Sequence, residues 1–124
     1  MAIYHCHCQV ISRGQGRSAV AAAAYRSGEK ITNSYDGVTH DYRKKKGIVY
    51  KEIMLCENAP EEWKDRALFW NNIEQAERDT AARLAREFEI ALPVELSTEE
   101  QIDFVRAFVH ENFVNIGMCA DFAI

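Results

Sequence analysis

The chain has 124 residues, of which 48% are hydrophobic and 27% are charged, as expected for one globular domain and not for a disordered or fibrous chain. Its longest apolar run, Ala19 to Tyr25, is far shorter than the roughly 20 residues that cross a bilayer. The first five residues also lack the basic and apolar regions of a signal peptide. We therefore expect a cytoplasmic domain without a membrane anchor, whose four cysteines are free thiols.

The net charge of −4 conceals an uneven distribution of charged side chains. Residues 1–50 contain eight basic and three acidic side chains, whereas residues 51–124 contain seven basic and sixteen acidic ones. Such a split predicts a basic face on an otherwise acidic body. The acidic total therefore does not exclude an anionic partner that binds the first fifty residues.

The first elements that the pattern predicts are a strand, a basic loop and a helix. Apolar and polar residues alternate from Ile3 to Ile11, as is typical of a strand, and residues 13–17 follow as a flexible basic loop. Four consecutive alanines favour a helix over residues 19–26. Ser18 is suited to be its N-cap, and Gly28 is suited to end it.

The middle of the chain predicts a hairpin and a second helix. Residues 29–46 are polar and basic with a turn signal at 35–38, and residues 48–55 are typical of a strand. Asn58 is expected to cap the next helix, with Pro60 in its first turn. The buried face of this helix is marked by residues at helical spacing, namely Phe69, Ile73, Ala76, Thr80 and Leu84.

A strand, a helix and a final strand complete the pattern. Residues 88–93 alternate between apolar and mostly acidic positions, which predicts a strand that ends at Pro93. Residues 97–100 match a capping box and open a helix whose apolar stripe continues to Ile116. Residues 118–124 are typical of a strand. This order predicts an α+β fold, in which helices pack on one face of a largely antiparallel sheet.

Two acidic side chains on one strand are the first candidates for chemistry. Alternation places Glu87 and Glu89 on the same face, where paired carboxylates could hold a divalent cation or act as a base. A solvated strand face would show the same pattern. Periodicity leaves both interpretations open.

The first predicted strand carries histidines and cysteines. His5 and His7 point to one face and Cys6 and Cys8 to the other, so the four cannot surround a single metal ion. We interpret them as buried thiols and as histidines that line a surface or a site. We predict no metal site within this chain.

A tyrosine and several basic residues indicate a phosphate-binding surface in the first fifty residues. The phenol of Tyr25, at the end of the predicted helix, is a weak nucleophile unless a cation stabilises the phenolate, and a tyrosine in this place is also suited to packing alone. Basic runs suit a nucleic-acid backbone but are also typical of solvated turns. The candidate DNA contacts are Arg13, Arg17, Arg26, Lys44 and Lys45.

Segments along nearly the whole chain, in order, carry a resemblance to a known family. The segments are residues 1–5, 12–28, 40–42, 57–60, the region of Trp70, 86–96 and 120–124. Residues 12–28 read SRGQGRSAVAAAAYRSG and residues 86–96 read REFEIALPVEL. Together they closely resemble the MobA/MobL family of plasmid mobilisation relaxases, which are of the MobQ type.

The resemblance implies a relaxase of the HUH endonuclease class and its fold. Such an enzyme nicks one DNA strand at an origin of transfer: a tyrosine attacks the phosphodiester, stays joined to the 5′ phosphate and leaves a free 3′ hydroxyl. Tyr25 falls at the nucleophile position of the family. Glu87 falls at an acidic active-site position, with Glu89 and Glu95 nearby. The implied partners are DNA at the origin, single-stranded on the nicked strand, and accessory mobilisation proteins.

The resemblance also implies a divalent metal, Mg²⁺ or Mn²⁺, held by three histidines in the full-length parent. Those histidines would follow Ile124 and are absent from this chain. We therefore expect residues 1–124 to be a single domain, the N-terminal part of a relaxase domain that is incomplete at its C-terminus and inactive in nicking by itself. The last strand would then leave an open sheet edge, which predicts homodimers.

Two other functions remain open from the sequence. A non-catalytic or regulatory module could bind single-stranded DNA through the basic half alone. A structural or assembly protein could use the acidic helices. Salt-sensitive DNA binding without cleavage would indicate the first of these, and absence of DNA binding at low salt would indicate the second.

Overall fold

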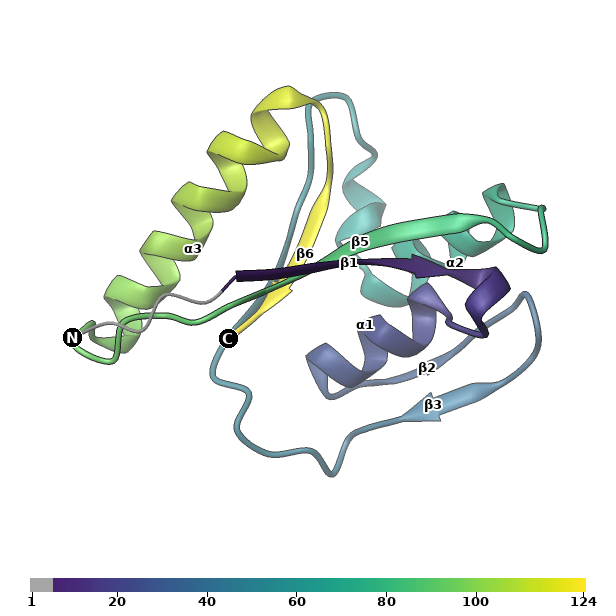
Figure 1. The fold of residues 1–124 in the computed structure, drawn as a ribbon, viewed down its shortest axis with the longest axis horizontal. Coiled ribbons are helices and arrows are strands. Elements are labelled where there is room, and N and C mark those ends of the chain that lie inside the picture. Colours follow the sequence, from purple (N-terminus) through teal and green to yellow (C-terminus); the bar gives the residue numbers. More distant parts are fainter. Residues whose placement is uncertain (1–5) are drawn as a thin grey trace.

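Three α-helices and three antiparallel strand pairs make up residues 6–124, the part of the chain that the computed structural model describes (Figure 1). The helices are α1 (Ala19–Ser27), α2 (Arg66–Ala76) and α3 (Thr98–Asn112). The strand pairs are β1 (Cys6–Ser12) with β5 (Arg83–Ile90), β2 (Lys30–Thr32) with β3 (Thr39–Asp41), and β4 (Lys51–Met54) with β6 (Ala120–Ala123). Three short 3₁₀ turns are η1 (Arg13–Gln15), η2 (Glu61–Lys64) and η3 (Val114–Ile116). The predicted α+β class is confirmed, with short antiparallel pairs in place of one continuous sheet.

The β1–β5 ladder sets the face on which the candidate site is built. Its register places His7 opposite Glu89 and Gln9 opposite Glu87. Residues that are directly opposite each other share a face, and alternation puts both pairs on the same one. The predicted first strand is confirmed from Cys6 onward. Its earlier residues, including His5, lie outside the described part of the chain.

The other face of the β1–β5 ladder is only partly covered. Cys6 and Cys8 are exposed there, so the interpretation of these cysteines as buried thiols is wrong. Their cross-strand partners Phe88 and Ile90 are also 36% and 37% exposed. The contact from the α3 side comes through the ring of Phe113, whose centroid lies 5.1 Å from that of Phe88. The strand pattern was correct, but burial of this face depends on how much of it another element covers.

Helix α1 begins and ends where the sequence predicts. The Ser18 hydroxyl accepts a hydrogen bond from the backbone N–H of Ala21 at 3.1 Å. Gly28 follows the helix with φ of 68°, a left-handed conformation that glycine adopts without strain. Val20 and Ala24 are fully buried. Small side chains on this helix allow close packing against α2 and the β2–β3 hairpin.

The prediction that Asn58 caps the second helix, with Pro60 in its first turn, is wrong. Asn58 takes a positive φ of 70°, and Pro60 precedes the separate turn η2. The chain therefore changes direction before α2 begins. Asp65 caps α2 instead, because its carboxylate accepts a hydrogen bond from the backbone N–H of Leu68 at 3.3 Å.

Helix α2 also ends earlier than its predicted apolar stripe. It stops at Ala76, and the carboxylate of Asp79 then accepts a hydrogen bond from the backbone N–H of Ala81 at 2.9 Å, which closes a tight turn. Thr80 therefore lies in this turn. Leu84 is buried in the core as part of β5, because strand pairing with β1 takes this segment out of the helical pattern.

Helix α3 begins with the predicted capping box. The Ser97 hydroxyl accepts a hydrogen bond from the Glu100 backbone at 3.2 Å, and the Glu100 carboxylate accepts one from the Ser97 backbone at 3.0 Å. The helix ends at Asn112, and Gly117 ends the short turn η3 rather than α3. Figure 1 shows α3 set apart from α1 and α2, on the far side of β6, whereas β2 and β3 lie on the opposite side of α1. No helix within residues 6–124 combines the length and apolar character needed to cross a membrane.

A buried carboxylate joins α2 to the start of α1. Glu74 is 1% exposed and accepts hydrogen bonds from the Ala19 backbone at 2.8 Å, the Ser18 hydroxyl at 3.1 Å and the Arg13 guanidinium at 2.9 Å. A negative charge is favourable at a helix N-terminus, where backbone N–H groups lack partners within the helix. The first turn of α1 is therefore anchored by a side chain of α2.

A second buried ion pair joins α2 to β6. The Arg66 guanidinium donates to both carboxylate oxygens of Asp121, at 2.7 and 2.8 Å. The indole N–H of Trp70 donates to the same carboxylate at 2.8 Å. Bidentate pairing fixes both the distance and the orientation of the two groups. The position of β6 relative to α2 is therefore set by these polar contacts as well as by strand pairing.

Candidate functional site

Tyr25 lies near the C-terminal end of α1 and is 53% exposed. Its ring meets the edge of the Tyr42 ring, with centroids 5.3 Å apart. The ammonium of Lys45 lies 3.6 Å from the centroid of the Tyr25 ring and also donates to the Tyr25 backbone carbonyl at 2.8 Å. These contacts orient the ring while about half of the residue remains open to solvent. An exposed, oriented phenol is what an attacking tyrosine requires.

Glu87 is a buried carboxylate on the neighbouring strand, 8% exposed. It accepts a hydrogen bond from the side-chain amide of Gln9 at 2.6 Å. The guanidinium groups of Arg26 and Arg17 lie 2.7 and 3.2 Å from its oxygens. Glu87 therefore draws one arginine from the end of α1 and one from the preceding loop onto β5.

The charge state of Glu87 follows from these neighbours. Burial raises the pKa of the carboxyl, whereas hydrogen bonds from Arg26 and Gln9 and the charges of Arg26 and Arg17 lower it by more, so the pKa lies below its ordinary value of 4.5. Glu87 is thus an anion at neutral pH with its oxygens already engaged. In this arrangement it orients two arginines, and it is a poor proton acceptor.

The two arginines keep part of their surface available. The side chains of Arg17 and Arg26 are 34% and 36% exposed. An arginine that is held by a carboxylate through some of its N–H groups can donate the others to a phosphate. Arg26 directly follows Tyr25 in α1, so the last turn of the helix that carries the candidate nucleophile also carries a fixed positive charge.

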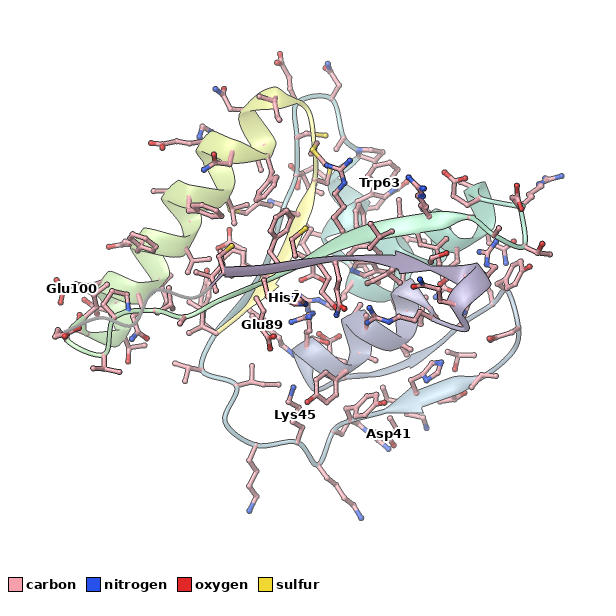
Figure 2. All side chains as sticks on the ribbon, in the orientation of Figure 1. His7, Asp41, Lys45, Trp63, Glu89 and Glu100 are labelled. Carbon is pink, nitrogen blue, oxygen red and sulfur yellow. The ribbon has the colours of Figure 1, made fainter. Side chains whose placement is uncertain are left out.

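Glu89 shares the face of Glu87, as alternation predicted, but its surroundings differ. It is exposed and lies opposite the exposed His7. Figure 2 shows both side chains on the β1–β5 ladder, with Lys45 on the segment that follows β3. Glu95 lies in the turn that follows β5. The sequence could not separate the two carboxylates; the structure does, because only Glu87 is brought against the arginines.

The basic residues at positions 43–46 have different surroundings. Arg43 pairs with Asp41 at 2.8 Å, so much of its charge is balanced within the protein. Lys45 lies over Tyr25, as described above. Lys44 is exposed on the same segment. Of the two predicted lysine contacts, one therefore lies against the candidate nucleophile.

Arg13 stands apart from the other predicted DNA contacts. Its side chain is 10% exposed and its guanidinium is directed at the buried Glu74, 2.9 Å away. The same guanidinium donates to backbone carbonyls at the end of α2 and lies over the ring of Tyr35. Its two terminal nitrogens donate hydrogen bonds inside the protein, and its Nε is buried, so we leave Arg13 out of the proposed DNA-contacting set.

The divalent metal that the sequence resemblance implies would be held by histidines that follow Ile124. Within residues 6–124, no three His, Cys, Asp or Glu side chains gather to hold a metal ion. Glu87 in particular is occupied by arginines. We therefore derive no chemical step through a metal.

Three contributors to the site were not among the candidate residues predicted from the sequence. Gln9, Tyr42 and Glu74 lie at ordinary strand, loop and helix positions, and their roles depend on which distant segments fold against them. Gln9 completes the donors around Glu87. Tyr42 and Glu74 act on α1, at its last and first turns respectively.

Comparison with known proteins gives this fold and site a class, that of conjugal transfer and mobilisation proteins. The profile of the MobA/MobL family matches residues 17–124. The chain belongs to the MobA/MobL family, and the resemblance seen in the sequence is confirmed.

The relatives agree in class and are longer than this chain. The chain is 41% identical to conjugal transfer protein TraA of Rhizobium radiobacter, over 98% of this chain and 12% of the relative. It is 40% identical to mobilization protein MobL of Acidithiobacillus ferridurans, over 100% of this chain and 32% of the relative. The chain thus spans about an eighth of the first protein and about a third of the second.

A solved structure shares the fold. It is described as "Molecular Basis of Vancomycin Resistance Transfer in Staphylococcus aureus" and is 32% identical, with a TM-score of 0.94. The match covers 99% of this chain and 62% of that one.

Proposed function

We propose that this chain is part of a relaxase, a transesterase that nicks one DNA strand at an origin of transfer during plasmid mobilisation. The observation that carries the proposal is the position of Tyr25, exposed at the end of α1 and followed directly by Arg26, which the buried Glu87 fixes. Membership of the MobA/MobL family supports DNA as the substrate class.

In the proposed reaction, the phenol oxygen of Tyr25 forms a bond to phosphorus while the bond from phosphorus to the 3′ oxygen breaks. The phenol gives up its proton, and the departing 3′ oxygen gains one. The products are a 5′-phosphotyrosine and a free 3′ hydroxyl. Because one phosphate diester is exchanged for another, the strand can be rejoined by the reverse reaction without a separate energy source.

The surrounding residues bind and orient the reacting groups. Arg17 and Arg26 would donate hydrogen bonds to nonbridging oxygens, where negative charge must be balanced for attack on an anionic phosphodiester. Lys45 fixes the ring of Tyr25. Glu87 is a positioning residue for the two arginines, and the exposed Glu89 is the candidate base on this face.

The divalent ion implied for the full-length protein, Mg²⁺ or Mn²⁺, would neutralise charge on the phosphate when bound. Because the described residues gather no metal-ligating group of three, we propose that residues 1–124 alone do not nick DNA efficiently. Efficient nicking by these residues with added metal would contradict this part of the proposal.

The decisive test is a covalent adduct formed by the full-length protein. A single-stranded oligonucleotide that contains the origin and is labelled at its 3′ end should become joined to the protein through Tyr25, and the adduct should survive denaturation in detergent. Tyr25→Phe should abolish the adduct. Tyr42→Phe is the matched control, since it removes a neighbouring hydroxyl but keeps the ring contact. Adduct formation by Tyr25→Phe at the normal rate would refute the assignment of the nucleophile.

A second candidate function is single-stranded DNA binding or regulation without cleavage. It is favoured by the partly exposed arginines of a chain in which the described residues gather no metal site. It predicts that the affinity for single-stranded DNA falls steeply as the salt concentration rises. It also predicts that the double variant Arg17→Ala/Arg26→Ala binds more weakly than the unchanged protein. Arg106→Ala, on the distant helix α3, is the control. Equal affinity of the two variants would count against this surface.

The proposed partners are DNA at the origin of transfer, single-stranded on the nicked strand, and accessory mobilisation proteins in the cytoplasm. We also propose a homodimer. It rests on the short strand pairs, since β6 pairs with β4 alone within residues 6–124 and an open strand edge favours pairing between chains. Light scattering at high protein concentration tests it, and a strictly monomeric mass would refute it.

A further inference from the structure

Two cysteines that are far apart in the sequence meet at the end of the β4–β6 ladder. The sulfur atoms of Cys56 and Cys119 are 3.1 Å apart, and the backbone N–H of Cys56 donates to the sulfur of Cys119 at 3.3 Å. The last pair of the ladder is Met54 with Ala120. The two cysteines therefore lie just beyond that pair, one on each strand extension.

The geometry is close to that of a disulfide. A sulfur–sulfur bond is about 2.05 Å long, so the two atoms need to approach by only about 1 Å. Both residues are half-buried, which leaves a small molecule access to them while limiting competition from larger ones. Ladder pairing and the Arg66–Asp121 ion pair hold the two backbone segments in place on either side.

We propose that Cys56 and Cys119 form a redox modification site, a dithiol that low-molecular-weight disulfides such as oxidised glutathione convert to an intrachain disulfide. One thiolate attacks a sulfur of the glutathione disulfide, which gives a mixed disulfide and releases one glutathione thiolate. The second cysteine then attacks the protein sulfur of the mixed disulfide and releases the other glutathione. The glutathione disulfide accepts the two electrons that the protein loses, and the two protons of the cysteines pass to the two glutathione thiolates that are released.

The surroundings of Cys119 set how fast this exchange runs. Burial raises the pKa of the Cys119 thiol by more than the backbone hydrogen bond from Cys56 lowers it, and the side chain of Cys56 raises it further. Since the thiolate is the attacking species, the rate of exchange should rise as the pH rises above neutrality.

Both cysteines line the wide apolar cleft between β5, α3 and β6. The disulfide would connect the ends of β4 and β6 covalently at this cleft. It would also close a loop of more than sixty residues, which restricts the unfolded chain strongly. Asp121, two residues beyond Cys119, holds the side chains of α2. The disulfide form should therefore be more stable than the dithiol form and rigid at β6.

The chain contains its own comparison pair. Cys6 and Cys8 are exposed on one face of β1, and two residues along a strand span about 6.6 Å. That spacing is at the limit for a disulfide, and the extended backbone holds the two side chains parallel. These cysteines should give mixed disulfides with glutathione rather than an intrachain bond.

The test uses two variants of the chain in buffers of defined glutathione composition. The variant C6S/C8S keeps only the proposed pair, and the variant C56S/C119S keeps only the comparison pair. Acid-quenched samples are analysed by intact mass and by alkylation of free thiols. We expect C6S/C8S to lose both thiols and two hydrogen masses without retaining glutathione. In the same buffers, C56S/C119S should retain glutathione on its exposed thiols, with a mass increase for each mixed disulfide.

Two further measurements keep the result interpretable. The single variants C56S and C119S, each in the C6S/C8S background, should give only a mixed disulfide on the remaining thiol, and circular dichroism establishes that they are folded. Oxidised C6S/C8S should unfold at a temperature higher by about 4 °C or more, and a reductant should reverse the shift. The proposal is overturned if C6S/C8S keeps two free thiols, or takes up two glutathiones, under conditions that modify the comparison pair.

Discussion

The guanidinium of Arg26 lies 2.7 Å from the carboxylate of Glu87, which joins the last turn of α1 to the middle of β5. The contact fixes the arginine that directly follows Tyr25 in α1. It also determines how Glu87 behaves, because a carboxylate that is buried among donors is held as an anion. The same pair therefore sets both the geometry of the proposed phosphate site and its response to pH.

The response to pH can be measured with Glu87→Gln. The pKa of Glu87 is lowered in the folded protein, so its charge stabilises the fold fully above the ordinary value of 4.5, and this contribution is lost as the pH falls through the lowered pKa. We expect the variant to lower the free energy of unfolding by about 1–2 kcal/mol at pH 7, since the arginines are about a third exposed. Denaturant titrations from pH 7 downward should show the two proteins converging. A difference in the free energy of unfolding that stays constant with pH would contradict a stabilising role for the Glu87 charge.

Glu74→Ala should be among the most damaging single substitutions in α2. It leaves Arg13 buried without its anion and removes the acceptor of the Ala19 backbone N–H. We expect the free energy of unfolding to fall by about 3–5 kcal/mol. Glu77→Ala, at an exposed position one residue past the helix, is the control and should change it by less than about 0.5 kcal/mol. Similar changes in the free energy of unfolding for the two variants would contradict the proposal that Glu74 anchors the start of α1.

Gly28 and Gly16 separate backbone strain from steric conflict. Both have a positive φ, 68° and 75°, but a Cβ at Gly28 would lie 2.7 Å from Cδ1 of Ile48, whereas one at Gly16 meets nothing within 4 Å. Gly16→Ala should cost about 1–2 kcal/mol from strain alone, and Gly28→Ala about 1 kcal/mol more. In a double-mutant cycle, Ile48→Ala should recover that additional cost. A coupling energy of zero would show that the Ile48 side chain simply moves aside.

Lys45→Met should affect adduct formation by Tyr25 more than Lys44→Met does. Each variant removes one positive charge, so each should reduce the salt dependence of DNA binding by a similar amount. Only Lys45 also fixes the Tyr25 ring and carbonyl. We expect Lys45→Met to slow adduct formation by the full-length protein about two- to fivefold further, as measured in single-turnover experiments at saturating DNA. Equal rates for the two variants would reduce Lys45 to a general backbone contact.

Local signals predicted the elements whose boundaries are set by neighbouring residues. Ser18 and Gly28 bound α1, and the Ser97 capping box opens α3, because each acts through backbone groups a few residues away. The Asn58 cap failed for the opposite reason. A 3₁₀ turn intervenes before α2, and nothing in the spacing of residues 58–61 distinguishes that turn from a helix start.

The sequence likewise predicted only those features of the candidate site that depend on neighbouring residues. Alternation correctly placed Glu87 and Glu89 on one face, but their different roles depend on Arg26 and Arg17, which are 61 and 70 residues from Glu87 in the sequence. Contacts over such separations leave no periodic signal. The family resemblance singled out Tyr25, and its role as nucleophile stays a prediction until the adduct is measured.

Helix α1 is held at its first turn by Glu74 and at its last turn by Tyr42 and Lys45, and it ends at Gly28. The exposed Tyr25 depends on these contacts for its position. A substitution at Glu74 would therefore loosen the helix that carries Tyr25. If the proposed function holds, a genetic screen for failed plasmid transfer would recover variants at Glu74 or Gly28 together with variants at Tyr25. Protein abundance in the donor cell, rather than the transfer frequency, would tell a lost anchor from a lost nucleophile.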